Sequence, residues 1–275
     1  MEHSTTQGHL SFSVCIISNV VNALLRQVVQ SAAALSDDIC IGLNTEQNET
    51  WDISQLEDMP VRVIHTPWKG YGATKNDLVA FARHDWILSI DSDEVIDEEL
   101  QQQLRQLPAI SEKVVYAFKR KNFIGPQHIR FGDYGREGLK PRLYNKKWVR
   151  WNNNSVHETP DIPADFIQQR VPGALLHYSA TDKAALAASN THYAHLSAAH
   201  KIREGVKVSS LKILMAPAIV FLKNYIFKLG FLDGATGFWL AKEYARYTRL
   251  KYYLVQNEKA MKKSTPNDRD KNAKQ

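Results

Sequence analysis

The sequence predicts an α/β protein built on a mainly parallel sheet, followed by a helical C-terminal extension. Apolar runs of strand length alternate with helical patterns through the first hundred residues, an acidic cluster directly follows the fourth run, and the last third is helical throughout. Strands alternating with helices at this spacing form βαβ units, whose strands are parallel. We therefore expect a sheet domain over residues 10–180, helices over 181–256 and a disordered basic tail over 257–275.

The expected elements follow the chain in order. Apolar runs bounded by polar residues predict strands at 11–18, 38–43, 60–65, 85–90, 114–121 and 171–178. Apolar residues at helical spacing predict helices at 19–35, 73–83 and 97–107. The first turn of the third helix is rich in acids, which the helix dipole favours. Short strands and loops are expected over 123–151, and the C-terminal helices are expected to break near Gly205, Pro217 and 230–237.

Composition and charge narrow the class of protein. The 275 residues are 44% hydrophobic and 23% charged, which is ordinary for a globular chain and excludes collagen-like and low-complexity classes. Residues 1–100 hold 5 Lys and Arg against 16 Asp and Glu, whereas residues 101–255 hold 24 against 10. This asymmetry suggests a cation site early in the chain and an anionic partner later. Basic faces that are merely solvated explain the second half equally well.

The sequence predicts that the protein is cytoplasmic. Cys15 and Cys40 lie in apolar runs and are interpreted as buried free thiols in a reducing compartment. The polar N-terminus lacks the basic and apolar regions of a secretory signal. A proline, a lysine and an asparagine interrupt the most apolar later stretch, residues 213–229. A membrane-spanning helix is therefore not expected.

The acidic cluster after the fourth strand is the first candidate site. Asp91 and Asp93, with Glu94 beside them, stand where a parallel strand ends, and ligands bind at that edge of such sheets. Mg²⁺ and Mn²⁺ prefer oxygen ligands and are often held by one or two carboxylates plus substrate phosphates. Chance produces a similar pattern at Asp268 and Asp270. An acidic helix entry with only capping value is the alternative interpretation.

Four segments carry a resemblance to a known family. WILSIDSDEVIDEEL (86–100) resembles the WILSLDADEVVSEEL segment typical of family-2 glycosyltransferases. WKGYGATKN (68–76) resembles a segment of the subgroup that adds a β-linked hexose to the inner core of lipopolysaccharide. KPRLYNKKWVRWNNNSVHE (140–158) and PAIVFLKNYIFKLGFLDGATGFWLA (217–241) resemble later segments of the same subgroup. The four matches occur in the right order and span most of residues 60–245.

The resemblance implies a GT-A-type fold, a nucleotide-diphosphate sugar donor and an inverting transfer to a lipopolysaccharide-core or similar glycolipid acceptor. It assigns Asp91 and Asp93 to a Mg²⁺ or Mn²⁺ ion and the donor diphosphate, with Ser92 between them. It places Lys75 and Asn76 near the donor.

The resemblance also makes Glu158 the candidate base, which takes the proton of the acceptor hydroxyl while the metal on Asp93 neutralises the departing diphosphate. A salt-bridge role for Glu158 remains open.

One segment departs from the family pattern. After the second strand, family members usually carry VVDSGSTDGT, whose first Asp holds the nucleobase of the donor. Here the segment reads IGLNTEQNET, with Leu43 at the position of that Asp and Asn44 beside it. Donor recognition through Asn44 or backbone amides is one interpretation. A catalytically impaired glycan-binding or scaffold protein is the other.

A basic and aromatic stretch, residues 134–151, is the candidate acceptor site. Arginine binds phosphate through two parallel hydrogen bonds, and aromatic rings offer flat faces to sugars. The candidate residues are Arg136, Arg142, Trp151 and His157. The expected acceptor is phosphorylated or a glycolipid. Single-stranded nucleic acid is the rival partner and is not expected, because the metal-site context does not require it.

The C-terminal helices leave further partners open. Residues 211–229 are partly amphipathic, with lysines beside apolar side chains. Peripheral contact with the inner face of a bacterial inner membrane, packing onto the sheet domain and homo-oligomer formation all fit this pattern. Four histidines, at 177, 192, 195 and 200, are interpreted as surface residues rather than a metal cluster.

Two other enzyme classes are alternatives. A nucleotidyltransferase usually carries a glycine-rich phosphate loop after its first strand, but SNVVNALLRQ stands there. A glycosyltransferase with a soluble or protein acceptor remains open.

Overall fold

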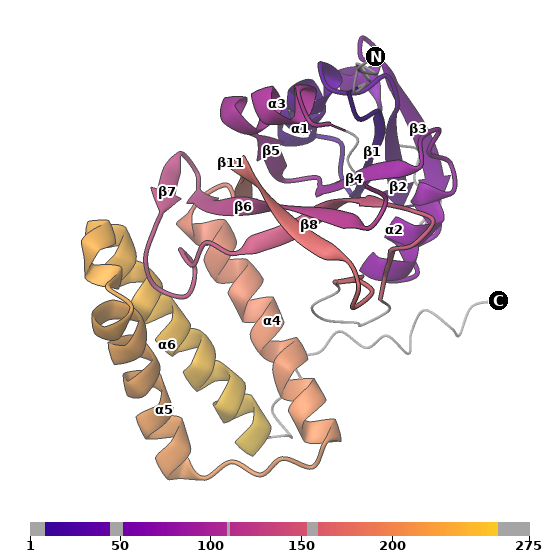
Figure 1. The fold of residues 1–275 in the computed structure, drawn as a ribbon. Coiled ribbons are helices and arrows are strands. Elements are labelled where there is room, and N and C mark those ends of the chain that lie inside the picture. The colour runs from indigo at the N-terminus through magenta and orange to yellow at the C-terminus, as the bar shows by residue number, and fades with distance from the viewer. Residues whose placement is uncertain (1–8, 45–51, 109–110, 153–158, 258–275) are drawn as a thin grey trace, which may run out of the picture. The chain divides into compact units, whose positions relative to one another are not determined.

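A computed structural model describes residues 9–44, 52–108, 111–152 and 159–257 (Figure 1). The chain divides into two compact units. The first comprises residues 1–121 and 137–177, and the second comprises residues 122–136 and 178–275. The segment 122–136 therefore groups with the C-terminal helices rather than with the rest of the sheet region. All but the first residue of the predicted tail, 257–275, lies outside the described residues.

A mixed sheet forms the centre of the first unit. Its parallel part comprises β3 (Val61–Thr66), β2 (Ile39–Asn44), β1 (Phe12–Ser18) and β4 (Trp86–Asp91), in that spatial order. It continues through β8 (Leu139–Asn145), β6 (Val114–Ile124), β11 (Ile167–Ala180) and β5 (Glu94–Ile96). The pairs β4–β8, β8–β6 and β11–β5 are antiparallel. The predicted α/β fold is confirmed, and the sheet is mixed rather than mainly parallel.

Helices cover both faces of this sheet. α1 (Ala23–Ala33) and α3 (Glu98–Arg105) pack on one face, and α2 (Tyr71–Val79) packs on the other. The side chains of Asn22 and Asp97 each accept a backbone N–H at 2.9 Å and cap α1 and α3. Caps of this kind satisfy donors that lack an intrahelical partner. The cap at Asn22 explains why α1 begins later than the predicted start at residue 19.

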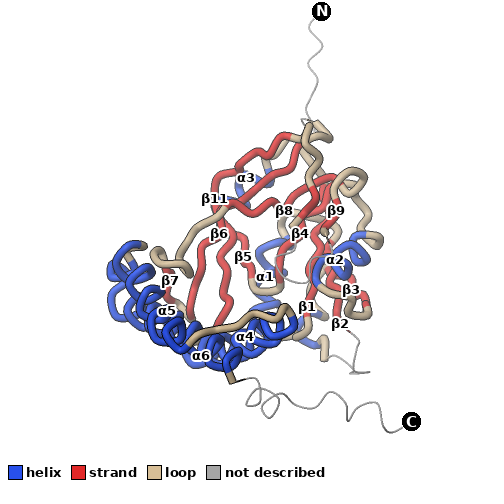
Figure 2. Tube along the Cα trace, turned by 90° about the horizontal axis from the view of Figure 1, so that it is seen from below, coloured by secondary structure: helices blue, strands red, loops and turns tan. Residues whose placement is uncertain are grey.

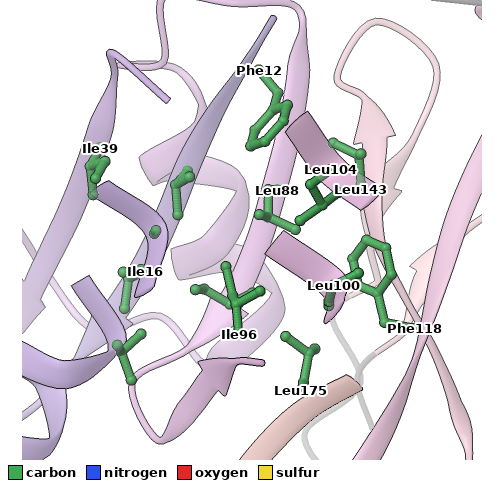
Figure 3. Close-up of a cluster of buried hydrophobic side chains, with 14 of the residues drawn as sticks. Phe12, Ile16, Ile39, Leu88, Ile96, Leu100, Leu104, Phe118, Leu143 and Leu175 are labelled. Atoms are coloured by element: carbon green, nitrogen blue, oxygen red, sulfur yellow. The ribbon is translucent and has the colours of Figure 1, made fainter. Parts of the chain in front are cut away.

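Two clusters of buried side chains fix the layers. The larger joins α1 and α3 to the sheet, and Figure 3 shows Leu100 and Leu104 of α3 close to Leu143 and Phe118 of the strands. The smaller joins Leu78 of α2 to its own face of the sheet. Burial of aliphatic and aromatic side chains of this size contributes about 1.5–3 kcal/mol each. These layers hold the carboxyl ends of the parallel strands in fixed positions.

The two cysteines face each other across β1 and β2. Cys15 and Cys40 are register partners, and both are buried and free, as predicted. The hydrogen bond with Cys40, together with burial, raises the pKa of the Cys15 thiol. Its role is that of a small apolar core residue.

The second unit contains three main helices, which Figure 2 shows lying together. They are α4 (Lys183–Arg203), α5 (Ser210–Leu222) and α6 (Gly234–Gln256), and both α4 and α5 pack against α6. The expected break at Pro217 is wrong, because α5 continues through it. The helix changes instead at a π turn, η2 (Lys223–Phe227), and a short 3₁₀ turn, η3 (Gly230–Asp233). The strand β7 (Gln127–Ile129) pairs with β6 in the same unit.

Polar anchors connect these turns to the segment before β8. Asp233 accepts backbone N–H groups of Arg130 and Phe131, the latter at 2.9 Å. Buried Asn224 accepts the backbone N–H of Asp133 at 2.8 Å. The π turn places the Asn224 side chain inside the unit, where its amide also donates to the carbonyl of Val220. The GFLDG segment is therefore structural within this unit.

The same segment depends on close backbone contact at Gly237. A Cβ atom at Gly237 would lie 1.8 Å from the carbonyl oxygen of Gly230. We expect Gly237→Ala to lower the free energy of unfolding by about 3 kcal/mol and the thermal midpoint by about 10 °C, because the backbones must separate. Circular dichroism melting measures both. Gly138→Ala is the matched control, since no atom lies within 4 Å of its added Cβ, and an equal loss there would contradict this account.

Candidate functional site

A cavity of about 460 Å³ lies at the carboxyl ends of the parallel strands in the first unit. Ligands in such sheets bind at this edge, because the backbone and the following loops diverge there. The cavity is lined by Ile17, Ser18, Asn19, Asn44, Trp68, Tyr71, Asp91, Ser92, Asp93 and His177. The cavity therefore joins polar groups from the ends of three neighbouring strands to two aromatic rings. These are Trp68, which precedes α2, and Tyr71, its first residue.

The acidic cluster supplies one wall of this cavity. Asp91 is the last residue of β4, and Ser92 and Asp93 form the turn into β5. The side chains of Asp91 and Asp93 keep 31% and 34% of their surface exposed. The Asp93 Oδ2 atom lies 3.3 Å from Nε2 of His177, which β11 contributes. Asp93 thus faces the cavity with an imidazole nitrogen beside it.

Two cations hold Asp91 in place. Its Oδ1 accepts a hydrogen bond from Lys75 Nζ at 2.8 Å, and its Oδ2 accepts one from Arg142 at 2.5 Å. Burial of the Asp91 carboxyl opposes its ionisation. The charges of Arg142 and Lys75 outweigh this effect and hold the pKa of Asp91 far below its usual range. Asp91 is therefore a fixed carboxylate with both oxygen atoms already bound.

Arg142 links Asp91 to a second acid. The arginine side chain is only 5% exposed and donates to Glu94 Oε1 at 2.7 Å, while Glu94 is fully buried. Burial alone would favour neutral arginine, but the carboxylates of Asp91 and Glu94 raise the pKa of Arg142.

The register between β6 and β8 shifts at Arg142, which is therefore the extra residue of a β-bulge. Bulges redirect side chains, and this one turns a strand residue toward the cavity edge.

Lys75 and Asn76 connect α2 to the short strand β9 (Arg150–Trp151). The ammonium of buried Lys75 lies 4.1 Å from the centroid of the Trp151 ring, a cation–π contact. Asn76 exchanges two hydrogen bonds with the backbone of Trp151, at 2.8 and 2.9 Å. A Cβ at Gly72 would lie 1.8 Å from the carbonyl oxygen of Asn152, so α2 approaches this segment closely. β9 pairs with β10 (Pro160–Asp161).

The predicted donor residues divide into two groups. Asn44, Asp91 and Ser92 line the cavity. Lys75 and Asn76 are absent from its lining and instead hold Asp91 and Trp151.

Leu43, which stands at the position of the family's usual Asp, belongs to the hydrophobic core. Successive strand residues face opposite sides, so at the end of β2 Asn44 and not Leu43 reaches the cavity.

The predicted acceptor residues lie in different settings. Arg142 and Trp151 are buried, and neither presents its side chain to an acceptor at the surface. The bulge and the α2 contacts draw both side chains inward, and their acceptor role stays a prediction. Arg136 is exposed and belongs to the second unit. His157 and the candidate base Glu158 lie outside the described residues.

Several cavity residues were missed from the sequence. Ser18 ends the first predicted strand and Asn19 follows it, so the rule that ligands bind at strand ends could have identified both. Trp68 and Tyr71 stand in the quoted WKGYG motif, and their rings make an edge-to-face contact with centroids 4.8 Å apart. His177 was interpreted as a surface residue, because only the pairing of β11 with β5 brings it to Asp93.

The cavity presents two side chains of metal-binding type close together, Asp93 and His177. Among the described residues, no group of three His, Cys, Asp or Glu side chains could hold an ion by itself. Asp93 and His177 do fit one edge of an octahedral ion, whose neighbouring ligands lie roughly 3 Å apart. Asp91 fits less well, because both of its oxygen atoms are bound to cations. An ion held here would need further oxygen ligands from a substrate.

The chain is similar to known glycosyltransferases. The family model described as "Glycosyl transferase family 2" matches residues 13–163. An uncharacterized glycosyltransferase of Rickettsia typhi is 27% identical over 253 residues, which cover 86% of this chain and 85% of the relative. The lipopolysaccharide core biosynthesis glycosyltransferase LpsC of Rhizobium meliloti is 27% identical over 210 residues, covering 74% and 75%. Among solved structures, TarS of S. aureus (residues 1–349) aligns with a TM-score of 0.40 and 14% identity over 92% of each chain.

Proposed function

Since the chain belongs to glycosyl transferase family 2, we propose that it moves a hexose from a nucleotide-diphosphate sugar to a lipopolysaccharide-core or similar glycolipid acceptor, with inversion at the anomeric carbon. The observation that carries this proposal is the cavity at the ends of the parallel strands, where the Asp91–Asp93 segment meets His177 and two aromatic rings. The similarity to LpsC supports the class of acceptor. A glycolipid acceptor would also place the protein at the inner face of a bacterial inner membrane.

We propose that the donor lies with its diphosphate at the acidic end of the cavity. Mg²⁺ or Mn²⁺ would be held by Asp93 and His177 and completed by phosphate oxygens of the donor, as these ions usually are in nucleotide sites. The ion would neutralise charge on the departing diphosphate. Asp91 keeps the segment in place through Lys75 and Arg142 rather than serving as a primary ligand.

The remaining cavity walls suit the nucleoside and the sugar. Trp68 and Tyr71 offer flat apolar surfaces, and Asn44 and Asn19 offer amide groups that donate and accept hydrogen bonds. Recognition of the base through Asn44 would replace the carboxylate that other family members carry at the neighbouring position.

Glu158 remains the proposed base. An inverting transfer needs a carboxylate that takes the proton of the acceptor hydroxyl as that oxygen attacks the anomeric carbon. Glu158 lies outside the described residues, but Asn152, the last described residue before it, is held by backbone and side-chain hydrogen bonds to Thr159. Glu158→Gln is expected to lose transfer while donor binding persists.

Cations beside the acidic cluster support an anionic acceptor. Nη1 of Arg120, on β6, lies 3.8 Å from Oε1 of Glu94. Lys140 is half-buried on the neighbouring strand β8. Burial, together with the guanidinium groups of Arg120 and Arg142, lowers the pKa of Lys140. No carboxylate within the described ranges forms a salt bridge with Lys140. We propose that it binds a phosphate or carboxylate of the acceptor.

Lys140→Met is expected to raise the KM for a phosphorylated acceptor by about tenfold and to leave the KM for the donor unchanged, because one charge-assisted hydrogen bond is lost. Steady-state kinetics with phosphorylated and dephosphorylated acceptors measure the effect. Lys140→Arg should restore most of the affinity. Lys147→Met is the control, since Lys147 pairs with Asp85 at the surface. Equal kinetics of Lys140→Met and wild type would reject this role.

Transfer itself is the test of the proposed function. The purified chain would be incubated with Mn²⁺, a panel of uridine-, guanosine- and thymidine-diphosphate hexoses, and deacylated lipopolysaccharide inner core. Mass spectrometry should show the acceptor heavier by one hexose with one donor. Donor binding without any transfer or hydrolysis would favour the alternative, a catalytically impaired glycan-binding protein, for which the absence of a carboxylate at Leu43 and Asn44 is the supporting observation.

A further inference from the structure

The second unit carries a continuous apolar surface on α5 and the turns that follow it. We define this apolar face by Leu211, Leu214, Met215, Ile219, Leu222, Ile226, Phe227, Leu229, Phe231, Leu232 and Phe238, all of which are exposed. Leu214 is 72% exposed and Phe227 is 80% exposed. Soluble monomers rarely expose contiguous apolar patches of this kind without a binding role.

The arrangement of the face follows from helical geometry. On α5 the exposed residues recur at intervals of three and four, so that they share one side of the helix. The other side of α5 packs against α6. Most residues of the face therefore belong to one helix side and its adjoining turns, and they are not scattered over the unit.

A helix spanning a bilayer does not explain this face well. Within the described residues, Ser210–Phe227 is long and apolar enough to span a membrane by length and composition, and 6% of it is buried. Asn224, however, is tied to the backbone of Asp133 inside the unit. α6, which packs on α5, carries Lys242, Arg246 and Arg249. Removal of such charges from water is costly, so contact through one side only is the favoured geometry.

The charge of the unit identifies the partner. The described part of the second unit holds 13 Lys and Arg against 5 Asp and Glu, a net charge of +8. Exposed Lys212 and Lys223 lie on α5 and at its end, and the ammonium of Lys242 lies 5.6 Å from the ring centroid of Phe238 in the face itself. Lysines that edge an apolar helix side are typical of binding to anionic lipid. A second copy would bring the same lysines together, and like charges oppose such an interface.

We infer that the apolar face docks onto an anionic lipid bilayer, into which its leucine and phenylalanine side chains insert while the surrounding lysines contact lipid phosphates. This inference rests on the proposed function in one respect: a glycolipid acceptor would be presented at a membrane, which gives the enzyme a reason to bind one. The surface itself is defined without reference to the cavity of the first unit.

Flotation with vesicles tests the inference. The full chain should float with vesicles of phosphatidylcholine and phosphatidylglycerol, and far less with phosphatidylcholine alone. Leu214→Ser combined with Ile219→Ser should lower partitioning by about tenfold or more, because two exposed apolar side chains of the face are removed. Leu139→Ser combined with Ile167→Ser removes exposed aliphatic side chains of the first unit and should leave binding unchanged. All four positions are exposed, so circular dichroism should show intact folds.

Other outcomes would overturn the inference. Equal flotation of both double variants would place the lipid contact elsewhere. A wild-type dimer in solution that becomes monomeric in the Leu214→Ser, Ile219→Ser variant would identify the face as a contact between two copies. These vesicles contain neither donor nor acceptor, so failure here leaves the transferase proposal intact. Donor hydrolysis in solution should be equal for both double variants and wild type.

Discussion

Replacement of Asp93 by alanine is expected to reduce hexose transfer by about a thousandfold while the protein stays folded. Asp93 is the carboxylate of the acidic cluster that faces the cavity with His177 beside it, and it is not tied to a lysine or arginine among the described residues. Its loss would remove a charged ligand of the proposed ion, whose neutralisation of the diphosphate would be worth several kcal/mol in the transition state. Single-turnover transfer with saturating donor measures it.

Two controls make this result specific. Asp165→Ala removes an exposed acid that pairs with Lys113 at the surface, and its transfer rate should equal that of wild type. The thermal midpoint of Asp93→Ala without ligands should lie close to that of wild type, because Asp93 is partly exposed. If transfer by Asp93→Ala stays within about threefold of wild type, the metal assignment is incorrect.

Replacement of Arg142 by methionine is expected to lower the free energy of unfolding by about 3–5 kcal/mol, the usual cost of removing one partner from a buried ion pair. Glu94 is fully buried, and both it and Asp91 lose a cation in this variant. Transfer should fall as well, because Asp91 no longer fixes the start of the acidic turn. Urea unfolding followed by tryptophan fluorescence measures the loss of stability.

A second substitution distinguishes charge from packing. If the uncompensated charge of Glu94 causes the loss, Glu94→Gln in the Arg142→Met background should recover part of the stability, since neighbouring sites couple. Arg150→Met, at an exposed position on β9, should be nearly neutral. A loss for Arg142→Met of less than about 1 kcal/mol would show that the network does not stabilise the fold.

Much of the first unit follows from local patterns. The runs that form β1, β2 and β4 are apolar because both faces of these strands are covered, and such runs are recognisable in sequence. The acidic turn after β4 is also predictable, because it stands directly after the apolar run that forms this strand. Asn22 shows where prediction from apolar spacing fails, because its cap and not the apolar pattern decides where α1 begins.

The site is harder to predict because its key contacts are long-range. The bulge that turns Arg142 inward depends on how β8 pairs with β6, and nothing local distinguishes Arg142 from the exposed cations near it. His177 reaches Asp93 only through the pairing of β11 with β5. Asn76 looked like a donor residue in its motif, yet its amide is used to hold Trp151.

A thermal-shift panel of nucleotide-diphosphate sugars, with and without Mn²⁺, tests the central claim most directly. A ligand that binds only the folded state raises the midpoint in proportion to its affinity and concentration. One nucleotide sugar should stabilise the wild-type protein only when Mn²⁺ is present, and Asp93→Ala should abolish that shift. If no nucleotide sugar stabilises the protein, or if the shift is equal without metal and in Asp93→Ala, the Asp93–His177 cavity is not a metal-dependent donor site.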